Sequence, residues 1–572
     1  MIILLSIIGL IACTAVLFPQ VRQMIMNLEE QISHRDIFSY QSWFEALLPY
    51  AMGGICFILL FDYCTLTNSG RTLVQKVKQE INECFSEIDF RSFVKPMLLM
   101  FGVYLLGILT IIRANFTYED DLRRSVDGYR GWHDWSRYVS DFSSIFVHGD
   151  TNITDISPLP QLLAILIMAI SSVLLVYIVS NKKITTVRLL ASIPLGLSPY
   201  FLECLSYKFD APYMAFSTLA SIFPFLFITR KKAFLFVSVI SLLIMCMTYQ
   251  AASGIYLVIL ILLCFRNWNK REKSYKELLS FLGIAVFAFC FAMLLFRFFL
   301  MKPHFDDKAS SAMFPLPHII NGMLSNIKNY ALVINHDLGM IWKIGIVLVL
   351  FFFIIQSTSQ SAQKKLLSFF VSIPIIVISF IASYGIYFLL TAPFYGPRAL
   401  FGFGVFLAVL CIYVVSDYKK IAIVAVLALN WCLFVFAFSY GNALADQARY
   451  AEFRITILLY DLSALYPNAD NENISIQLKN TIDYAPSIKN IAKHYPIIEQ
   501  LVPERLGELK DAWKGWWNIY YFEVYFNNGF TLNGLEGYYR TDYNSLNLPV
   551  VLDSYYHTIQ SDGNHILITL KH

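Results

Sequence analysis

The sequence predicts a mainly helical membrane protein, with about thirteen transmembrane helices and a C-terminal α/β domain outside the membrane. Three observations support this fold class. Only 15% of the 572 residues are charged and 57% are hydrophobic, whereas soluble domains carry about 25% charged residues. Apolar runs recur along most of the chain, and every second loop between them is basic. Together these features indicate a chain that crosses a bilayer many times.

The apolar runs are long enough to cross the ~30 Å hydrocarbon core of a bilayer as helices. The first run has the length of a signal peptide but lacks a basic segment before it, so we expect a retained first helix. The predicted spans are 1–19, 46–63, 96–113, 159–180, 188–203, 211–229, 233–248, 250–265, 279–300, 341–356, 367–391, 399–416 and 421–440.

Lysine and arginine predict the orientation of the chain. The basic clusters are Arg71–Arg91, Lys182-Lys183, Arg230-Lys231-Lys232, Arg266–Lys276, Lys364-Lys365 and Lys419-Lys420. They alternate with loops that are poor in Lys and Arg, and basic loops face the cytoplasm. The amino terminus is therefore expected inside. An odd number of spans then places the C-terminal region outside.

The chain divides into three predicted parts. Residues 1–92 form a two-helix addition with a basic cytoplasmic linker, 93–440 form the transmembrane core, and 441–572 form the outer domain. The last part combines a helical pattern, Asp446–Leu465, with a β-prone stretch, His565–Leu570. Its roughly 130 residues suffice for a small domain.

Composition excludes several classes of function. The net charge of +4 is small and its basic residues are dispersed, so we expect no nucleic-acid partner. The ten cysteines fall mostly in apolar runs, without Cys-X-X-Cys or Cys/His spacing. We therefore expect buried thiols rather than a metal site or a disulfide framework.

The first predicted outer loop carries the strongest candidate site. Glu119, Asp120 and Asp121 follow an apolar span and stand beside Arg123 and Arg124. Such carboxylates can act as a general base, orient a hydroxyl or hold a divalent cation. The arginines would keep a base ionised or bind phosphate. The alternative is a solvated, salt-bridged loop at a helix end.

The second outer loop offers Lys302, His304 and the acidic pair Asp306-Asp307. Its content of proline and serine favours an ordinary exposed loop. Lys302 or His304 could nevertheless meet a lipid phosphate near the bilayer surface.

Two tight turns add further charged residues. In Tyr207–Pro212, the favoured interpretation is that Lys208 and Asp210 pair with each other. In Tyr395–Arg398, Arg398 is the sole cation, and its guanidinium is suited to bidentate phosphate binding.

The C-terminal region contains a dense aromatic patch. Its members are Trp513, Trp516, Trp517, Tyr520 and Tyr521. Sugar rings stack on such faces, but an interfacial belt or a core explains the patch equally well.

Several short motifs on the predicted outer face carry a family resemblance. They are Asn115-Phe-Thr-Tyr-Glu-Asp-Asp-Leu-Arg123 followed by Gly128-Tyr129 and Trp132, Ser157-Pro-Leu-Pro-Gln161, Ser206-Tyr-Lys-Phe-Asp210, Gly396-Pro-Arg398 and Asn442-Ala-Leu-Ala-Asp-Gln-Ala-Arg-Tyr450. In this order they resemble the serotype-converting O-antigen glucosyltransferases, the Gtr type II family of bacteria and their phages. The resemblance covers about residues 93 to 465.

The resemblance implies a GT-C-class membrane glycosyltransferase in the bacterial inner membrane. Its donor would be an undecaprenyl-phosphate-linked sugar on the periplasmic face, and its acceptor a lipid-linked O-antigen. A donor synthase and a flippase would supply the donor. Neither a cofactor nor a metal is implied.

The resemblance also implies roles for individual residues. Asp120 or Asp121 would deprotonate or orient the acceptor hydroxyl, with Glu119 as the third acid of the group. The residues expected near the lipid phosphate are Arg123, Arg124, Arg398, Lys302 and His304. The residues expected to contact substrate are Tyr118, Trp132, Lys208 and Asp210.

Two other functions stay open. A flippase or transporter of lipid-linked oligosaccharides would use acids as an ion pathway, but transporters place ionisable residues inside their spans and show repeated halves. Here most charges fall in loops, which favours an enzyme. An O-antigen polymerase or ligase would also use the outer loops, with an oligosaccharide diphosphate lipid as its donor.

Overall fold

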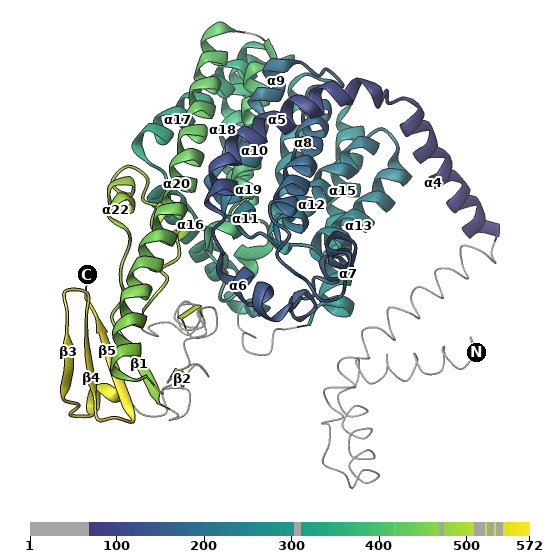
Figure 1. Cartoon of the computed structure of the whole chain (residues 1–572). Helices are drawn as coiled ribbons and strands as arrows, with labels where there is room; N and C mark the ends of the chain where they lie inside the picture. Colours follow the sequence, from purple (N-terminus) through teal and green to yellow (C-terminus); the bar gives the residue numbers. More distant parts are fainter. Residues whose placement is uncertain are drawn as a thin grey trace, which may run out of the picture.

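The computed structural model describes residues 68–302, 311–417, 419–467, 474–507, 521–522, 531–532 and 542–571. The predicted spans 1–19 and 46–63 lie outside these residues. So do His304, the pair Asp306-Asp307 and four members of the aromatic patch, Trp513, Trp516, Trp517 and Tyr520. The other eleven predicted spans fall on helices (Figure 1).

Seven helical segments are long and apolar enough to cross a membrane, among the residues that the structure describes. They are α5 (Arg91–Ala114), α8 (Leu159–Val179), η3 with α14 (Gln250–Ala252, Ser253–Asn269), α15 with η4 (Tyr275–Leu295, Phe296–Leu300), α17 (Met340–Ser359), α18 (Lys365–Ala382) and α20 (Lys420–Leu465). A bent pair, described next, raises the number to eight. The predicted count of thirteen spans is therefore not confirmed.

The bent span consists of α9 (Thr186–Ala191), α10 (Pro194–Leu197) and α11 (Pro199–Ser206), with a bend of 61°. Pro199 lacks the N–H of a continuous helix, and its ring would clash with the preceding turn. Ser198 instead adopts an extended conformation and accepts a hydrogen bond from the Phe201 N–H at 3.3 Å. The break therefore starts a new, capped helix.

The remaining predicted spans are short helices. They are α12 (Ala211–Ile222) continued by η2 (Phe223–Phe227), α13 (Lys231–Cys246) and α19 (Gly402–Val414). At 13 residues, α19 is only about 20 Å long. Every residue of α19 is buried, because other helices surround it. A helix shielded from lipid need not match the thickness of the bilayer.

The contact between α20 and α5 requires a glycine, Gly441. A Cβ atom at Gly441 of α20 would lie 2.4 Å from Thr110 Oγ1 of α5. Small residues let helices approach in this way, which suits a membrane where packing rather than water exclusion holds helices together. The contact joins the first described span to the last.

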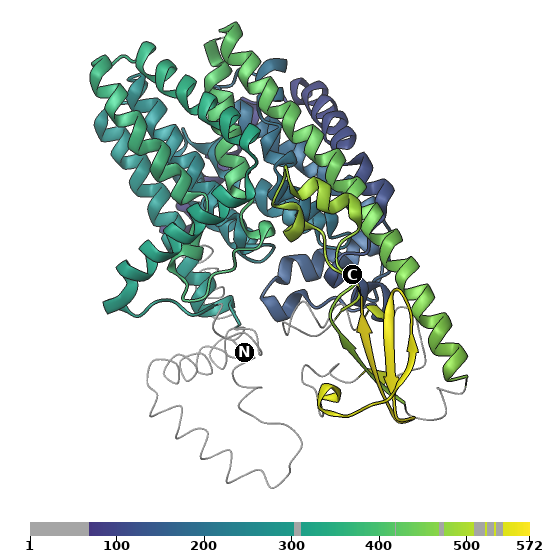
Figure 2. The same ribbon diagram turned by 90° about the vertical axis from the view of Figure 1, so that its left-hand side faces the viewer.

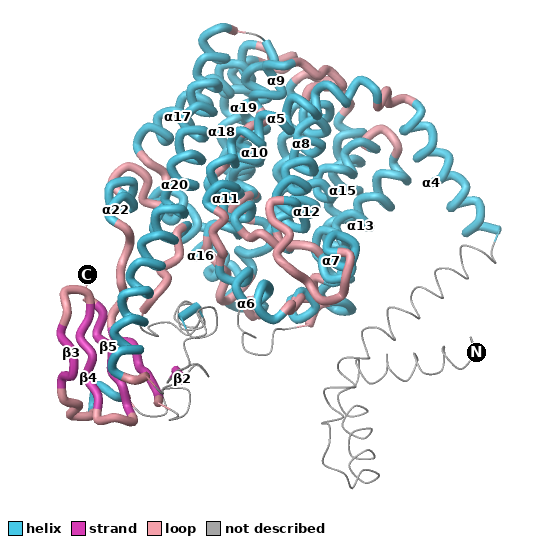
Figure 3. The backbone as a smooth tube through the Cα atoms, in the orientation of Figure 1, coloured by secondary structure: helices cyan, strands magenta, loops and turns pink. Residues whose placement is uncertain are grey.

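Shorter helices gather at the two ends of the bundle (Figures 1 and 3). At one end lie α6 (Glu119–Asp127), η1 (Trp132–Trp135), α7 (Tyr138–His148), η6 (Leu316–His318), α16 (Ile319–Asp337), η7 (Gly385–Leu389) and η8 (Pro397–Ala399). At the other end, η9 (Val415–Asp417) and the basic loops join the spans, and α4 (Asn68–Ser86) precedes α5. The basic loops and α6 therefore lie at opposite ends of the bundle.

The C-terminal region forms a five-stranded sheet with strand order β2-β1-β5-β4-β3 (Figure 3). The strands are β1 (Ser475–Lys479), β2 (Thr531–Leu532), β3 (Val550–Asp553), β4 (His557–Ser561) and β5 (His565–Leu570). β1 pairs in parallel with β2 and β5, and β4 pairs antiparallel with β3 and β5. The short helices of this region are α22 (Pro486–Ala492), α23 (Ile498–Leu501) and η11 (Tyr543–Ser545).

A single helix joins the bundle to the sheet. α20 continues without a break from the bundle to Leu465, beside the strands (Figure 2). Its residues Ile455 and Leu458 share an apolar core with Ile476 and Ile566 of the sheet. The expected helix Asp446–Leu465 and strand His565–Leu570 are confirmed. The predicted domain boundary between residues 440 and 441 falls inside α20, and the division into domains stays a prediction.

Candidate functional site

The acidic loop folds into a short helix, α6. Asn115 ends α5 in the left-handed conformation (φ 45°), and the chain then extends through Tyr118. The Asp121 carboxylate accepts a hydrogen bond from the Tyr118 N–H at 3.3 Å, as a capping side chain does. The three acids thus occupy the first turn of α6, where the helix dipole favours negative charge.

Asp121 is a buried anchor for a second loop. Its carboxylate accepts hydrogen bonds from the backbone N–H groups of Lys208 (2.9 Å) and Phe209 (3.3 Å), and its side chain is fully buried. Burial raises the pKa of Asp121, while the Lys208 N–H and Arg124 oppose that shift. No surface is left for a substrate on this carboxylate, so its position indicates a structural role.

Arg124 and Asp210 form a buried ion pair between α6 and the start of α12. The Trp132 indole N–H also donates to Asp210, and the Arg124 guanidinium lies 4.2 Å from the centroid of the Trp132 ring. All three were expected to touch substrate or phosphate. The structure brings the three buried side chains together, and their contacts with substrate stay a prediction.

The expected pairing of Lys208 with Asp210 is wrong. Lys208 Nζ lies 2.9 Å from Asp155 Oδ2, and Asp210 pairs with Arg124. Burial raises the pKa of Asp155, but hydrogen bonds from Ser157 and the charge of Lys208 outweigh it and lower the pKa. The two residues stand two positions apart in a turn, so their side chains diverge and meet partners from different segments.

Glu119 and Arg398 form the more exposed ion pair of the site. Arg398 Nη1 lies 3.1 Å from Glu119 Oε2, and each side chain is 25% exposed. The Tyr207 hydroxyl donates to the same Glu119 oxygen at 2.6 Å, and the Arg398 guanidinium lies 4.8 Å from the Tyr207 ring centroid. The Arg398 backbone N–H donates to Glu203. These contacts fix an arginine that keeps unused N–H groups at an accessible position.

Asp120 differs from both neighbouring acids. Its side chain is half-buried, and among the described residues its carboxylate has no hydrogen bond or ion pair. Burial raises the pKa of Asp120, the charges of Arg124 and Arg398 lower it, and Asp210 and Glu119 raise it. A carboxylate with a raised pKa and no bonded partner among the described residues is a stronger base than an ordinary aspartate, and is suited to accept a proton.

The other predicted phosphate-binding residues lie apart. Arg123 points away, toward Asp127 (3.5 Å) and the ring of Tyr129 (4.3 Å). Lys302 is exposed, and its backbone N–H donates to the Ser136 hydroxyl at 2.8 Å. The segment at Lys302 therefore packs beside η1, on the same end of the bundle as α6.

Sequence reasoning missed Tyr440 and Glu203 at this site, whereas Tyr118 was expected to contact substrate. Tyr118 is fully buried, and its hydroxyl donates to the Leu501 carbonyl at 2.7 Å. The Tyr440 hydroxyl donates to the same carbonyl at 3.2 Å, so the segment around α23 packs directly under α6. Glu203 could have been identified from the sequence, because a lone acid in an apolar run is energetically costly and usually has a role.

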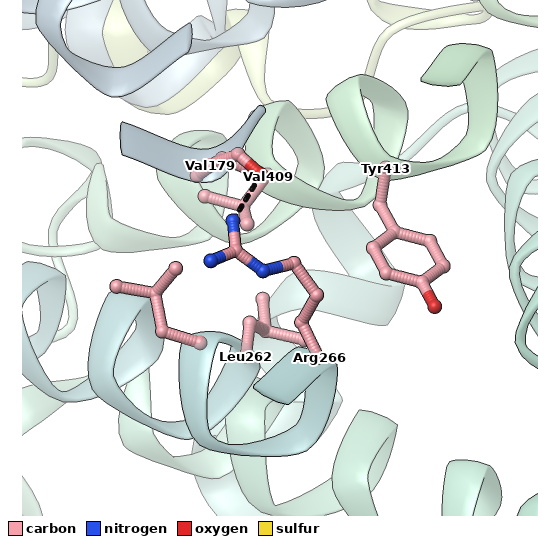
Figure 4. A pocket seen from close by; sticks show the side chains of 6 residues that line it. Val179, Leu262, Arg266, Val409 and Tyr413 are labelled. Carbon is pink, nitrogen blue, oxygen red and sulfur yellow. Dashed lines mark hydrogen bonds between the residues drawn. The ribbon is translucent and has the colours of Figure 1, made fainter. Parts of the chain in front are cut away.

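A separate pocket lies at the opposite end of α8 (Figure 4). It is lined by Val179, Leu262, Leu263, Arg266, Val409 and Tyr413. Arg266 donates to the Val179 carbonyl at 2.7 Å and the Ile178 carbonyl at 3.2 Å. Arg266 thus caps the C-terminal end of α8. None of the six residues lining this pocket is acidic, so none could act as a general base. Among the described residues, no group of three His, Cys, Asp or Glu side chains could hold a metal ion.

The fold and the site define a multispanning helical membrane protein. At one end of its bundle lie a partly exposed arginine and a carboxylate that has no bonded partner among the described residues. This is the arrangement expected of an enzyme whose substrates lie at a membrane surface. The chain belongs to the glucosyl transferase GtrII family, whose model matches residues 109–415. That stretch contains α6, the 207–210 loop and Arg398.

One relative extends the similarity beyond the family model. A Salmonella phage P22 protein, described as an uncharacterized 55.3 kDa protein in the gtrB 5' region, is 24% identical over 488 residues. The match covers 78% of this chain and 96% of the relative. No solved structure matches the chain.

Proposed function

We propose that this protein transfers a glucosyl or other hexosyl group from an undecaprenyl-phosphate-linked sugar to an O-antigen or related lipid-linked polysaccharide. The reaction takes place on the periplasmic face of the bacterial inner membrane. Membership of the GtrII family supports glucosyl transfer. The position of α6, at the end of the spans away from the basic loops, supports the periplasmic face. A donor synthase and a flippase supply the donor to that face.

The observation that carries this proposal is the free carboxylate of Asp120. Asp121 is occupied by backbone N–H groups, and Glu119 is held by Arg398 and Tyr207. Asp120 is therefore the acid that can approach an acceptor hydroxyl. It takes the hydroxyl proton while the acceptor oxygen bonds to the anomeric carbon of the sugar.

Arg398 receives the leaving group in this mechanism. As the new bond forms, the bond from the anomeric carbon to the phosphate oxygen breaks, and the lipid phosphate leaves with the electron pair. The guanidinium offers five N–H donors, and Glu119 engages Nη1. The remaining donors can bind the phosphate and stabilise its developing charge. Glu119 and Tyr207 hold the guanidinium in place before the substrate arrives.

The proposal is tested by transfer from radiolabelled undecaprenyl-phosphate glucose to a lipid-linked O-antigen in detergent. Asp120→Asn is expected to lower kcat by about 10²–10⁴-fold, the usual effect of losing a positioned base. Asp127→Asn, at the exposed end of the same helix, is the matched control and should retain activity. Full activity of Asp120→Asn would contradict the assignment of the base, and an inactive wild type would contradict the proposed reaction.

The flippase alternative draws on one observation, the acid Glu203 inside the bent span. Its carboxylate already accepts the Arg398 N–H and lies 3.5 Å from the Tyr118 hydroxyl, which indicates a structural role. Movement of a labelled lipid-linked sugar across vesicles, without transfer, would favour the flippase. Transfer only from an oligosaccharide diphosphate lipid would favour the polymerase or ligase.

A further inference from the structure

Arg505 is a buried arginine with no anionic partner among the described residues. It follows α23 in the C-terminal region and is only 3% exposed. Among the described residues, its guanidinium makes no hydrogen bond and no ion pair. Buried arginines are normally paired, because taking an uncompensated charge out of water costs several kcal/mol. An unpaired one at this depth therefore requires an explanation.

Two aromatic rings hold the Arg505 guanidinium in place. Its Cζ lies 4.0 Å from the ring centroid of Phe116 and 4.6 Å from that of Tyr521. Ring contacts of this kind use the faces of the guanidinium and leave its in-plane N–H donors free. The result is a planar fork of fixed orientation, the geometry that binds a phosphate in bidentate fashion.

The backbone around Arg505 is also fixed. Leu506 is buried and its carbonyl accepts the Ile482 N–H at 3.1 Å. On the other side, Leu501 accepts the Tyr118 and Tyr440 hydroxyls. The segment is thus attached both to the sheet region and to the membrane bundle, so the guanidinium cannot easily swing into solvent.

The surroundings of Arg505 join it to the proposed active site. Phe116 lies in the extended stretch that leads from α5 into α6. Burial lowers the pKa of Arg505, and the nearby charges of Glu119 and Asp121 oppose that shift. These acids influence the guanidinium without bonding to it. Arg505 is therefore a second positive group, besides Arg398, near the first turn of α6.

We propose that Arg505 binds a phosphate group of a lipid-linked substrate, which makes the C-terminal region part of the active site. This inference rests on the proposed function. The phosphate belongs either to the monophosphate lipid of the donor or to the diphosphate lipid of the acceptor. Either lipid would supply an anionic partner for a buried charge that has none among the described residues.

The test compares Arg505→Met with wild type and with Arg449→Met. Methionine keeps an apolar stem between the two rings and removes the charge. Arg449 is the control, because its side chain is 80% exposed on α20. Thermal unfolding in detergent is measured with undecaprenyl phosphate, undecaprenyl diphosphate, inorganic phosphate and neutral undecaprenol as probes.

We expect the phosphate lipids to stabilise wild type and Arg449→Met more than undecaprenol does. Arg505→Met should bind them about 10-fold or more weakly, as expected for a lost charge-assisted hydrogen bond. Preference for the monophosphate assigns the site to the donor, and preference for the diphosphate assigns it to the acceptor. Without ligand, Arg505→Met should be at least as stable as wild type, since it removes an uncompensated charge.

Unchanged lipid binding by Arg505→Met would overturn the inference. If that result came with a loss of stability in the absence of ligand, Arg505 would be a structural arginine. The binding readout does not depend on catalysis. If wild type binds the lipids through Arg505 but transfers no sugar, the proposed function fails and the phosphate site stands. If transfer proceeds with unchanged KM for both substrates in Arg505→Met, the site alone fails.

Discussion

Replacing Asp121 by alanine should destabilise the protein far more than the same change at Asp120. Asp121 accepts hydrogen bonds from three backbone N–H groups, those of Tyr118, Lys208 and Phe209. Alanine leaves all three without an acceptor at a fully buried position. Each buried unsatisfied N–H costs ~1–3 kcal/mol, and such costs are not fully additive. We expect a loss of roughly 3–6 kcal/mol.

Asp120→Ala provides the matched comparison. This carboxylate has no bond to lose among the described residues, so the expected loss is less than about 1 kcal/mol, from its place in the first turn of α6. Thermal unfolding in detergent measures both variants, and transfer activity per folded molecule separates folding from chemistry. Equal destabilisation by the two substitutions, or a larger effect at Asp120, would refute the assignment of Asp121 as the anchor.

Two further predictions concern the base and the bundle. Because burial raises the pKa of Asp120 and a base must be ionised, kcat/KM should fall as pH drops through that raised pKa, which lies above the ordinary aspartate value. A pH–rate profile checks this, and an acid limb at the ordinary value would contradict it. Gly441→Leu should force α20 away from α5 and lower the unfolding temperature, because even a Cβ added at Gly441 would lie only 2.4 Å from Thr110 Oγ1. Gly102→Leu should leave the unfolding temperature unchanged, because nothing lies within 4 Å of a Cβ added there. Equal changes of unfolding temperature in the two variants would contradict the close contact between α5 and α20.

Some of the structure follows from local sequence patterns. The apolar runs within the described residues form helices, and the periodic stretch Asp446–Leu465 and the β-prone stretch His565–Leu570 form α20 and β5. Hydrophobicity and its period act on neighbouring residues, so they can be read along the chain. The number of spans could not be read in this way. Helices such as α19 are buried by other helices, and their length is set by packing rather than by the bilayer.

The candidate site was only partly predictable. Its location in the first loop followed from three acids beside an apolar run. The partners of those acids did not, as the wrong pairing of Lys208 with Asp210 shows. Each ion pair depends on which distant loop packs against α6, and the distance between two residues along the sequence does not predict this packing. Arg505 was missed for the same reason, since an arginine next to Glu504 in the sequence gives no local sign of what its side chain contacts.

The sequence by itself predicted the membrane environment of this protein and the location of its candidate site. A charge-poor chain with repeated apolar runs must satisfy its backbone as helices in lipid, and the acids had to lie in a loop between them. Only the tertiary structure decided which acid is free. Adjacent residues on α6 point in directions about 100° apart, so Asp121 faces the buried 207–210 loop while Asp120 keeps an open carboxylate. Burial and partnership are properties of packing, and packing joins residues that the sequence keeps far apart.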